Sequence, residues 1–181
     1  AILFLRDYPD VAHRLLEKLT EMTIDYLRLQ IAAGADAVQL FESAANLLSR
    51  AQYETWALPY QQRIIEALRG TVPTIIFARD WADAAHLKSS GADILSLSEK
   101  VTIADARSQF GEAQALQGNL DNRLLVTGSK DEIAAAARAV VEAGGHRGHI
   151  FNLSHGLLRE TPFENVVHLI DVVKSTRLPL T

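Results

Sequence analysis

One pattern, a helical stretch followed by glycine and a short apolar run, occurs three times in this 181-residue chain and limits its fold more than any other feature. The three segments are Ala32–Phe41, Ser89–Leu97 and Ala143–Phe151. A glycine just past a helix accepts the left-handed backbone conformation without penalty. A short apolar run after it is typical of a parallel strand that is buried on both faces. The repetition therefore predicts βαβ units with right-handed crossovers, which means an α/β fold.

Two more apolar runs, Thr74–Ala78 after Pro73 and Ala113–Gln117, bring the predicted strands to five. Helices are expected between the strands, over Asp10–Ile31, Tyr53–Leu68, Trp81–Lys88, Ile103–Phe110, Asp131–Glu142 and Pro162–Thr176. Pro59 should kink or divide the second helix, because proline lacks the amide hydrogen that a helix interior needs. Ser129 is a good cap for the helix that begins at Asp131.

The alternation of helices and strands continues along the chain without a linker, a charge run or a low-complexity tract. Residues 1–181 are therefore expected to form a single α/β domain. Five strands do not close a (β/α)8 barrel, which typically takes about 250 residues. The sequence is compatible with an open sheet or with part of a barrel that other residues complete.

Composition excludes several classes of function. The formal net charge is −4, so no polybasic field exists to attract nucleic acid or an anionic membrane surface. Cysteine is absent, which excludes disulfides and thiolate chemistry and fits a reducing compartment. The sequence has no apolar run long enough to span a membrane and no signal-peptide pattern. The apolar start without methionine is expected either for a piece of a longer product or for a chain whose methionine was trimmed.

Polar residues follow each of the five predicted strands, where parallel α/β folds place their sites. They are Glu42-Ser43, Arg79-Asp80, Ser98-Glu99, Asn119-Leu120-Asp121 and the group Asn152, Ser154 and His155. Strand ends carry polar residues in inert proteins too, so position alone does not assign a role to any of them.

His155 is the strongest single candidate, because a histidine between serine and glycine at a strand end can donate to an anion or titrate near neutrality. The alternative, a ring satisfied by a neighbouring carbonyl, is equally compatible with the local sequence. The Ser43 hydroxyl could bind a carboxylate or cap the following helix. His149 lies inside a strand pattern and is expected to be a core histidine with one internal partner. The histidines lack metal-ligand spacing, so no metal site is expected.

In order along the chain, several segments resemble the C-terminal half of the uroporphyrinogen decarboxylase family. Residues 26–43 are similar to the family's YLxxQIxAGAxAVQxFxS, and Leu58-Pro59-Tyr60 to its LPY. Residues 116–121 resemble LQGNLDP, and residues 148–156 with Thr161 to Val166 resemble GHIFNLGHGI and TPxENV. The segments Ile75–Ala78, Gly91–Asp93 and Ala104–Arg107 also follow in the family's order.

The resemblance implies the C-terminal part of a (β/α)8 TIM barrel that acts as a cofactor-free homodimer in the cytoplasm. The family's reaction in haem biosynthesis removes carbon dioxide from the four acetate side chains of uroporphyrinogen III, giving coproporphyrinogen III. Protonation of a pyrrole ring would supply the electron sink, with protein groups assisting in acid–base steps and orientation. By resemblance, Ser43 and His155 would bind the carboxylates of this tetrapyrrole substrate, with His155 as the catalytic residue.

Three segments depart from the family pattern. Ser98-Glu99 stands where the family usually has Asp-Trp, Ala44-Ala45-Asn46 replaces an aromatic residue or histidine followed by Ala-Gly, and Arg159 stands where proline is common. The family's essential aspartate, arginine-rich strand and site tyrosine precede the matched region. We therefore expect the 181 residues alone to be inactive as a decarboxylase.

Two other functions are compatible with the sequence. A non-catalytic half barrel could pair its exposed strand edges with another copy or another chain. A corrinoid-dependent methyltransferase of the same superfamily fits less well, because such enzymes hold zinc partly through cysteine thiolate.

Overall fold

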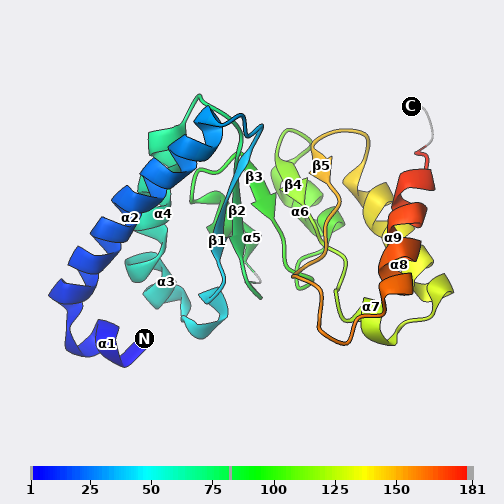
Figure 1. Cartoon of the computed structure of the whole chain (residues 1–181), viewed down its shortest axis with the longest axis horizontal. Helices are drawn as coiled ribbons and strands as arrows, with labels where there is room; N and C mark the ends of the chain where they lie inside the picture. The colour runs from blue at the N-terminus through cyan, green and yellow to red at the C-terminus, as the bar shows by residue number, and fades with distance from the viewer. Residues whose placement is uncertain (1, 82, 179–181) are drawn as a thin grey trace. The chain divides into compact units, whose positions relative to one another are not determined.

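The computed structural model describes residues 2–81 and 83–178, and it divides the chain into two compact units (Figure 1). The first unit holds the residues up to Arg79 together with Ala85–Ile94. The second holds Asp80–Ala84 and the residues from Leu95 onward. The single domain expected from the sequence stays a prediction.

In the first unit, two helices cover two parallel strands. The elements up to Arg79 are α1 (Ile2–Asp7), α2 (Pro9–Ala32), β1 (Val38–Glu42), the 3-10 turn η1 (Ala45–Leu47), α3 (Arg50–Trp56), α4 (Leu58–Leu68) and β2 (Thr74–Ala78). Strands β1 and β2 pair in parallel, with Val38 opposite Thr74 and Glu42 opposite Ala78. Helices α2 and α4 lie side by side in Figure 1.

The sequence explains where these helices begin and end. Ser49 caps α3 in a capping box with Gln52, and each of the two residues bonds the other's backbone. Pro59 stands in the first turn of α4, where its missing amide hydrogen costs nothing, so one predicted helix becomes two. The apolar faces of α2 and α4 close on β1 through a core of Leu27, Val38, Ile64 and Leu68. The expected division at Pro59 is confirmed.

The second unit again pairs two parallel strands beneath two helices. Its elements from residue 103 onward are α6 (Ile103–Phe110), β4 (Ala115–Gln117), α7 (Leu124–Thr127), α8 (Lys130–Gly144), β5 (His149–Ile150) and α9 (Phe163–Ser175). Strands β4 and β5 pair with Leu116 opposite His149. Helices α8 and α9 lie side by side in Figure 1. They enclose a core that includes Leu125, Ile133, Leu169 and Val172.

Two elements contain residues of both units, α5 (Ala84–Lys88) and β3 (Ile94–Ser96). Helix α5 is shorter than the predicted Trp81–Lys88, so Trp81 is not helical. Asp80 has a positive φ of 53°, a left-handed conformation that interrupts a helix, and the chain turns there before α5 begins. Residue 82 lies outside the described residues.

All five predicted strands are present, and Gly34, Gly91 and Gly145 after their helices have positive φ, as expected. The strand predicted over Ala113–Gln117 begins two residues later, at Ala115. Within the described residues, the model contains no helix that is both long and apolar enough to cross a membrane.

Candidate active site

Ser43 follows the carboxyl end of β1 and is exposed. Ser43 lies in the turn that follows the strand. Two residues earlier, Phe41 is 63% exposed, and its ring centroid lies 5.8 Å from that of Phe77 on β2. The carboxyl end of β1 thus carries an exposed aromatic ring and is followed by an exposed hydroxyl. Sequence reasoning did not identify Phe41.

Glu42 points to the opposite face of β1, toward the helices. Its carboxylate accepts hydrogen bonds from the Gln61 side chain at 3.3 Å and from the backbone amide of Ala44. Burial raises the pKa of the Glu42 carboxyl, and these two hydrogen bonds partly offset that rise.

His155 follows β5 at the end of a continuous ladder of backbone hydrogen bonds. Beyond the strands, Leu120 donates to the Asn152 carbonyl at 3.1 Å, and Ser154 donates to the Leu120 carbonyl at 2.7 Å. The amide of Gly156 donates to His155 Nδ1 at 2.7 Å. Because Nδ1 accepts that bond, the proton of the neutral ring sits on Nε2. The His155 ring is half-buried.

The loop around His155 is fixed by Asn122, whose side chain is 7% exposed. Its Nδ2 donates to the Gly156 carbonyl at 2.7 Å, linking the segment after β4 to the segment after β5. Sequence reasoning did not identify Asn122, because no local pattern reveals a partner 34 residues away.

Other predicted strand-end residues in the second unit have structural partners. Asn119 is buried and donates to the carbonyls of Ser98 at 2.8 Å and Val101 at 2.5 Å. The buried hydroxyl of Ser98 donates to the Trp81 carbonyl at 3.0 Å. These contacts fix the loops after β3 and β4.

An exposed charge cluster accounts for two further candidates. Arg123 binds Asp121 at 2.8 Å and lies 3.7 Å from Glu99. Hydrogen bonding to Arg123 holds the pKa of the Asp121 carboxyl below its usual range. In the same unit, Asn152 Oδ1 accepts from the Leu153 amide at 2.8 Å.

His149 has the internal partner expected of a core histidine. Its Nε2 donates to the Gly118 carbonyl at 2.7 Å, and the ring is half-buried. Burial lowers the pKa of His149, the hydrogen bond to Gly118 opposes that shift, and Arg107 lowers the pKa further. The ring occupies the space next to Gly144, where a methyl group would overlap it.

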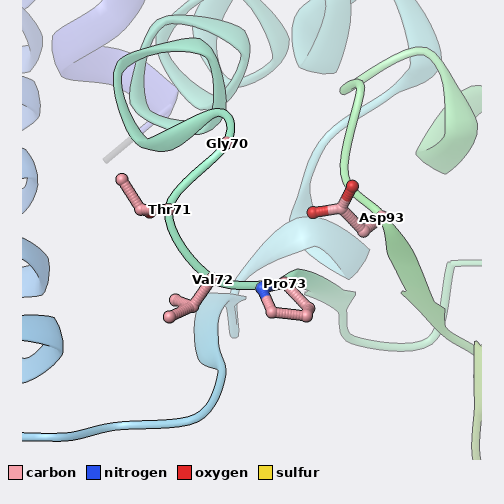
Figure 2. Close-up of a pocket in the computed structure, with 5 residues that line it drawn as sticks. All are labelled: Gly70, Thr71, Val72, Pro73 and Asp93. Atoms are coloured by element: carbon pink, nitrogen blue, oxygen red, sulfur yellow. The ribbon is translucent and has the colours of Figure 1, made fainter.

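A pocket of about 360 Å³ lies at the other ends of the first unit's strands. Figure 2 shows its lining, Asp93 on one side and the segment Gly70–Pro73 on the other. The Asp93 carboxylate accepts from the backbone amide of Thr74 at 2.8 Å and from its hydroxyl at 2.9 Å. Because the pocket precedes β2 and β3, it lies away from the carboxyl ends that carry chemistry in this fold class. The contacts made by Asp93 indicate a role in stability.

Ser43 and His155 each lie just beyond the carboxyl end of a strand, as predicted. Ser43 belongs to the first unit and His155 to the second. Each unit therefore contributes one polar side chain that is accessible to a ligand.

The solved structures include a similar fold. A methyltransferase from Methanosarcina mazei matches with a TM-score of 0.80 at 21% identity, over 96% of this chain and 52% of that chain. This likeness concerns the fold alone. It supports the prediction of an α/β chain built like part of a (β/α)8 barrel.

Curated relatives share much more sequence. The uroporphyrinogen decarboxylase of Chloroflexus aurantiacus is 42% identical over 98% of this chain and 52% of its own length. That of Nostoc punctiforme is 42% identical over 92% of this chain and 48% of its own length. The chain thus spans about half the length of these relatives. The family model for uroporphyrinogen decarboxylase matches residues 1–176. A match over nearly the whole sequence, with the expected strands in place, means that this chain belongs to the uroporphyrinogen decarboxylase family.

Proposed function

We propose that this chain, completed by the remaining strands and helices of the family's barrel, decarboxylates uroporphyrinogen III to coproporphyrinogen III. The observation that carries the proposal is the family match over residues 1–176, within which Ser43 and His155 lie at accessible strand ends. Each step breaks the bond between an acetate methylene and its carboxylate. A proton first adds to a pyrrole carbon, carbon dioxide leaves, and the electron pair of the broken bond passes into the protonated ring. A second proton converts the resulting exocyclic methylene to a methyl group, and the ring releases the first proton, so each step consumes one proton.

His155 is proposed to bind a substrate carboxylate through its Nε2–H. The hydrogen bond from Gly156 to Nδ1 selects the tautomer in which Nε2 is the donor. Ser43 is proposed to bind a second carboxylate through its exposed hydroxyl. The contact between Phe41 and Phe77 at the end of the strands supports an apolar surface for a pyrrole ring in the first unit. Anchoring several carboxylates orients the one that leaves.

Exposed apolar side chains support the proposal that more of the barrel covers the first unit. They recur every three or four residues along α2, at Val11, Leu15, Leu19, Met22, Tyr26 and Leu29, and Leu3 of α1 and Tyr8 before α2 are exposed as well. A continuous apolar stripe on a helix is typical of a face that packs against another element. We propose that the remaining length of the relatives supplies that element.

The proposal extends to the assembly, the compartment and the ligand of the enzyme. Both units are proposed to belong to one α/β domain of a homodimeric cytoplasmic enzyme whose partner molecule is the tetrapyrrole. The net charge of −4 supports a small-molecule role over binding to nucleic acid or to an anionic membrane.

The test combines this chain with the N-terminal half of the Chloroflexus aurantiacus relative and measures coproporphyrinogen formation. We expect turnover from the pair and none from the chain alone. His155→Ala and Ser43→Ala should each lower kcat/KM by about 100-fold, as expected for lost charge-assisted contacts. His168→Ala is the matched control, since that ring donates to the Lys130 carbonyl on the helical side. A stable pair without turnover, or full activity in both variants, would refute the proposal and favour a non-catalytic assembly module.

A further inference from the structure

A buried chain of polar side chains lies behind Ser43. The Tyr53 hydroxyl of α3 donates to Gln61 Oε1 of α4 at 2.8 Å, and Gln61 Nε2 donates to Glu42 Oε2 of β1 at 3.3 Å. Tyr53 is fully buried and Gln61 is 4% exposed. Three elements are thereby joined at the carboxyl end of β1.

The order of these bonds fixes the orientation of the amide. Because the phenol hydroxyl occupies the carbonyl oxygen of Gln61, its nitrogen is directed at Glu42. Burial raises the pKa of Tyr53 to about 12, so the phenol keeps its proton and remains a donor at neutral pH. The Glu42 carboxylate also accepts from the amide of Ala44, on the far side of Ser43. Glu42 therefore fixes the segment that contains Ser43 to α4.

The hydrogen-bonded set of Glu42, Gln61 and Tyr53, here called the tether, lies on the side of β1 that faces the helices. Val38 and Leu40 pack in the core formed with α2 and α4, and Glu42 continues that face. Ser43 follows in the turn directly after the strand and is exposed. A tether at half-buried Glu42 can thus fix the exposed residue next to it without touching a ligand.

We propose that Glu42, Gln61 and Tyr53 are positioning residues that hold the Ser43 hydroxyl in place for a substrate carboxylate. The inference rests on the proposed function of Ser43 as a carboxylate ligand. None of the three needs to touch substrate, and Glu42 is required only as a hydrogen-bond acceptor. This requirement separates positioning from proton transfer, in which the ionisable carboxyl would be indispensable.

The first experiment records the backbone amide signals of Ser43 and Ala44 in the 181-residue chain by ¹H–¹⁵N spectroscopy. Gln61→Leu and Tyr53→Phe should shift both signals and accelerate hydrogen exchange at Ala44 by about tenfold. Gln62→Leu and Tyr60→Phe are matched controls on α4, since Gln62 binds the Ser89 carbonyl and the Tyr60 hydroxyl binds His13. Equal shifts in the controls would overturn the proposal. Tyr53→Phe removes a single oxygen and keeps the test valid if Gln61→Leu does not fold.

The second experiment compares Glu42→Gln with Glu42→Leu. The glutamine retains an acceptor oxygen, so it should preserve the Ser43 and Ala44 signals, whereas the leucine should shift them as Gln61→Leu does. In the complemented enzyme, Glu42→Leu should raise KM about tenfold with little change in kcat, and Glu42→Gln should restore KM. Loss of kcat in Glu42→Gln would overturn the positioning role. If the complemented wild-type pair has no turnover, the amide signals still decide whether the tether exists, and only the proposed function fails.

Discussion

The two units fix the segments next to their strands by different means, the first after β1 and the second mainly before β4 and β5. In the first unit, one side chain holds another: Tyr53 bonds Gln61, and Gln61 bonds Glu42. In the second unit, side chains hold backbone carbonyls. The Arg107 guanidinium, 8% exposed, donates to the carbonyls of Glu112, Gln114, Gly144, Arg147 and Gly148 at 2.6 to 3.4 Å.

The difference lies in what each arrangement demands of the sequence. Every residue supplies a carbonyl, so the second unit needs only the donors Arg107, Asn119 and Asn122. The first unit needs a matched set of three side chains, one of them the Glu42 carboxyl with a raised pKa. The loop after β1 is therefore sensitive to substitution at each of three residues, whereas the segments before β4 and β5 depend heavily on Arg107.

Arg107→Met should lower stability more than any other substitution proposed here, because it removes the side chain that holds the backbone carbonyls of the second unit. Five carbonyls would lose a charged donor, and buried acceptors left unsatisfied are costly, so we expect a loss of about 3 kcal/mol or more. Urea unfolding measures the loss, and hydrogen exchange should localise it to the segments around Gly144 and Gly148. Arg63→Met is the control, because its exposed ion pair with Glu17 at 3.2 Å should contribute less than about 1 kcal/mol. Equal losses in both variants would contradict the comparison.

His149 should make the second unit sensitive to acid, with a smaller effect. Its pKa is lowered in the folded chain from an ordinary value of 6.5, so below that pH the unfolded chain binds the proton first. Stability then falls as the pH drops from about 6.5 through the folded pKa. His149→Gln should show less loss between pH 7.5 and pH 5.5 in urea unfolding. An unchanged pH dependence would show that the ring does not titrate in this way.

Much of the fold follows from local sequence, and the exceptions have local causes. Strands and long helices were predicted because apolar runs and helical periodicity reflect burial against a core. Helix α1 is not predicted, because its six residues begin with four consecutive apolar side chains, a run without helical periodicity. Helix α7 was missed because Leu124–Thr127 is a single turn that resembles a short strand.

The site could be predicted only in part. The rule that chemistry collects at strand ends gave the positions of Ser43 and His155. The residues that fix those positions come from distant parts of the chain: Gln61 is 19 residues from Glu42, and Asn122 is 34 residues from Gly156. Such partners depend on how helices pack on strands, and a single sequence carries no local signal for that packing.

The smallest expected effect sharpens the comparison at the helix starts, where each unit has a capping box. The Ser49 amide donates to the Gln52 amide oxygen at 2.9 Å, and the Ser129 amide donates to the Glu132 carboxylate at 2.7 Å. Hydrogen bonds from Ser129 lower the pKa of Glu132 from 4.5, so this cap is fully formed above pH 4.5 and is lost as the pH falls through the folded value.

Only one of the two caps should therefore respond to acid. Between pH 7 and pH 3 the amide signal of Ser129 should titrate with a midpoint below 4.5, and that of Ser49 should stay in place. The third residue of each helix, called N3, is Gln52 in α3 and Glu132 in α8. Exchanging these two residues, Glu132→Gln together with Gln52→Glu, should transfer the titration from Ser129 to Ser49. If Ser49 titrates in the unmodified chain, its cap depends on a charge elsewhere, and the contrast between the two caps does not hold. If the exchange moves the titration as expected, the acid response of each cap is set by the single side chain at N3, whichever unit carries it.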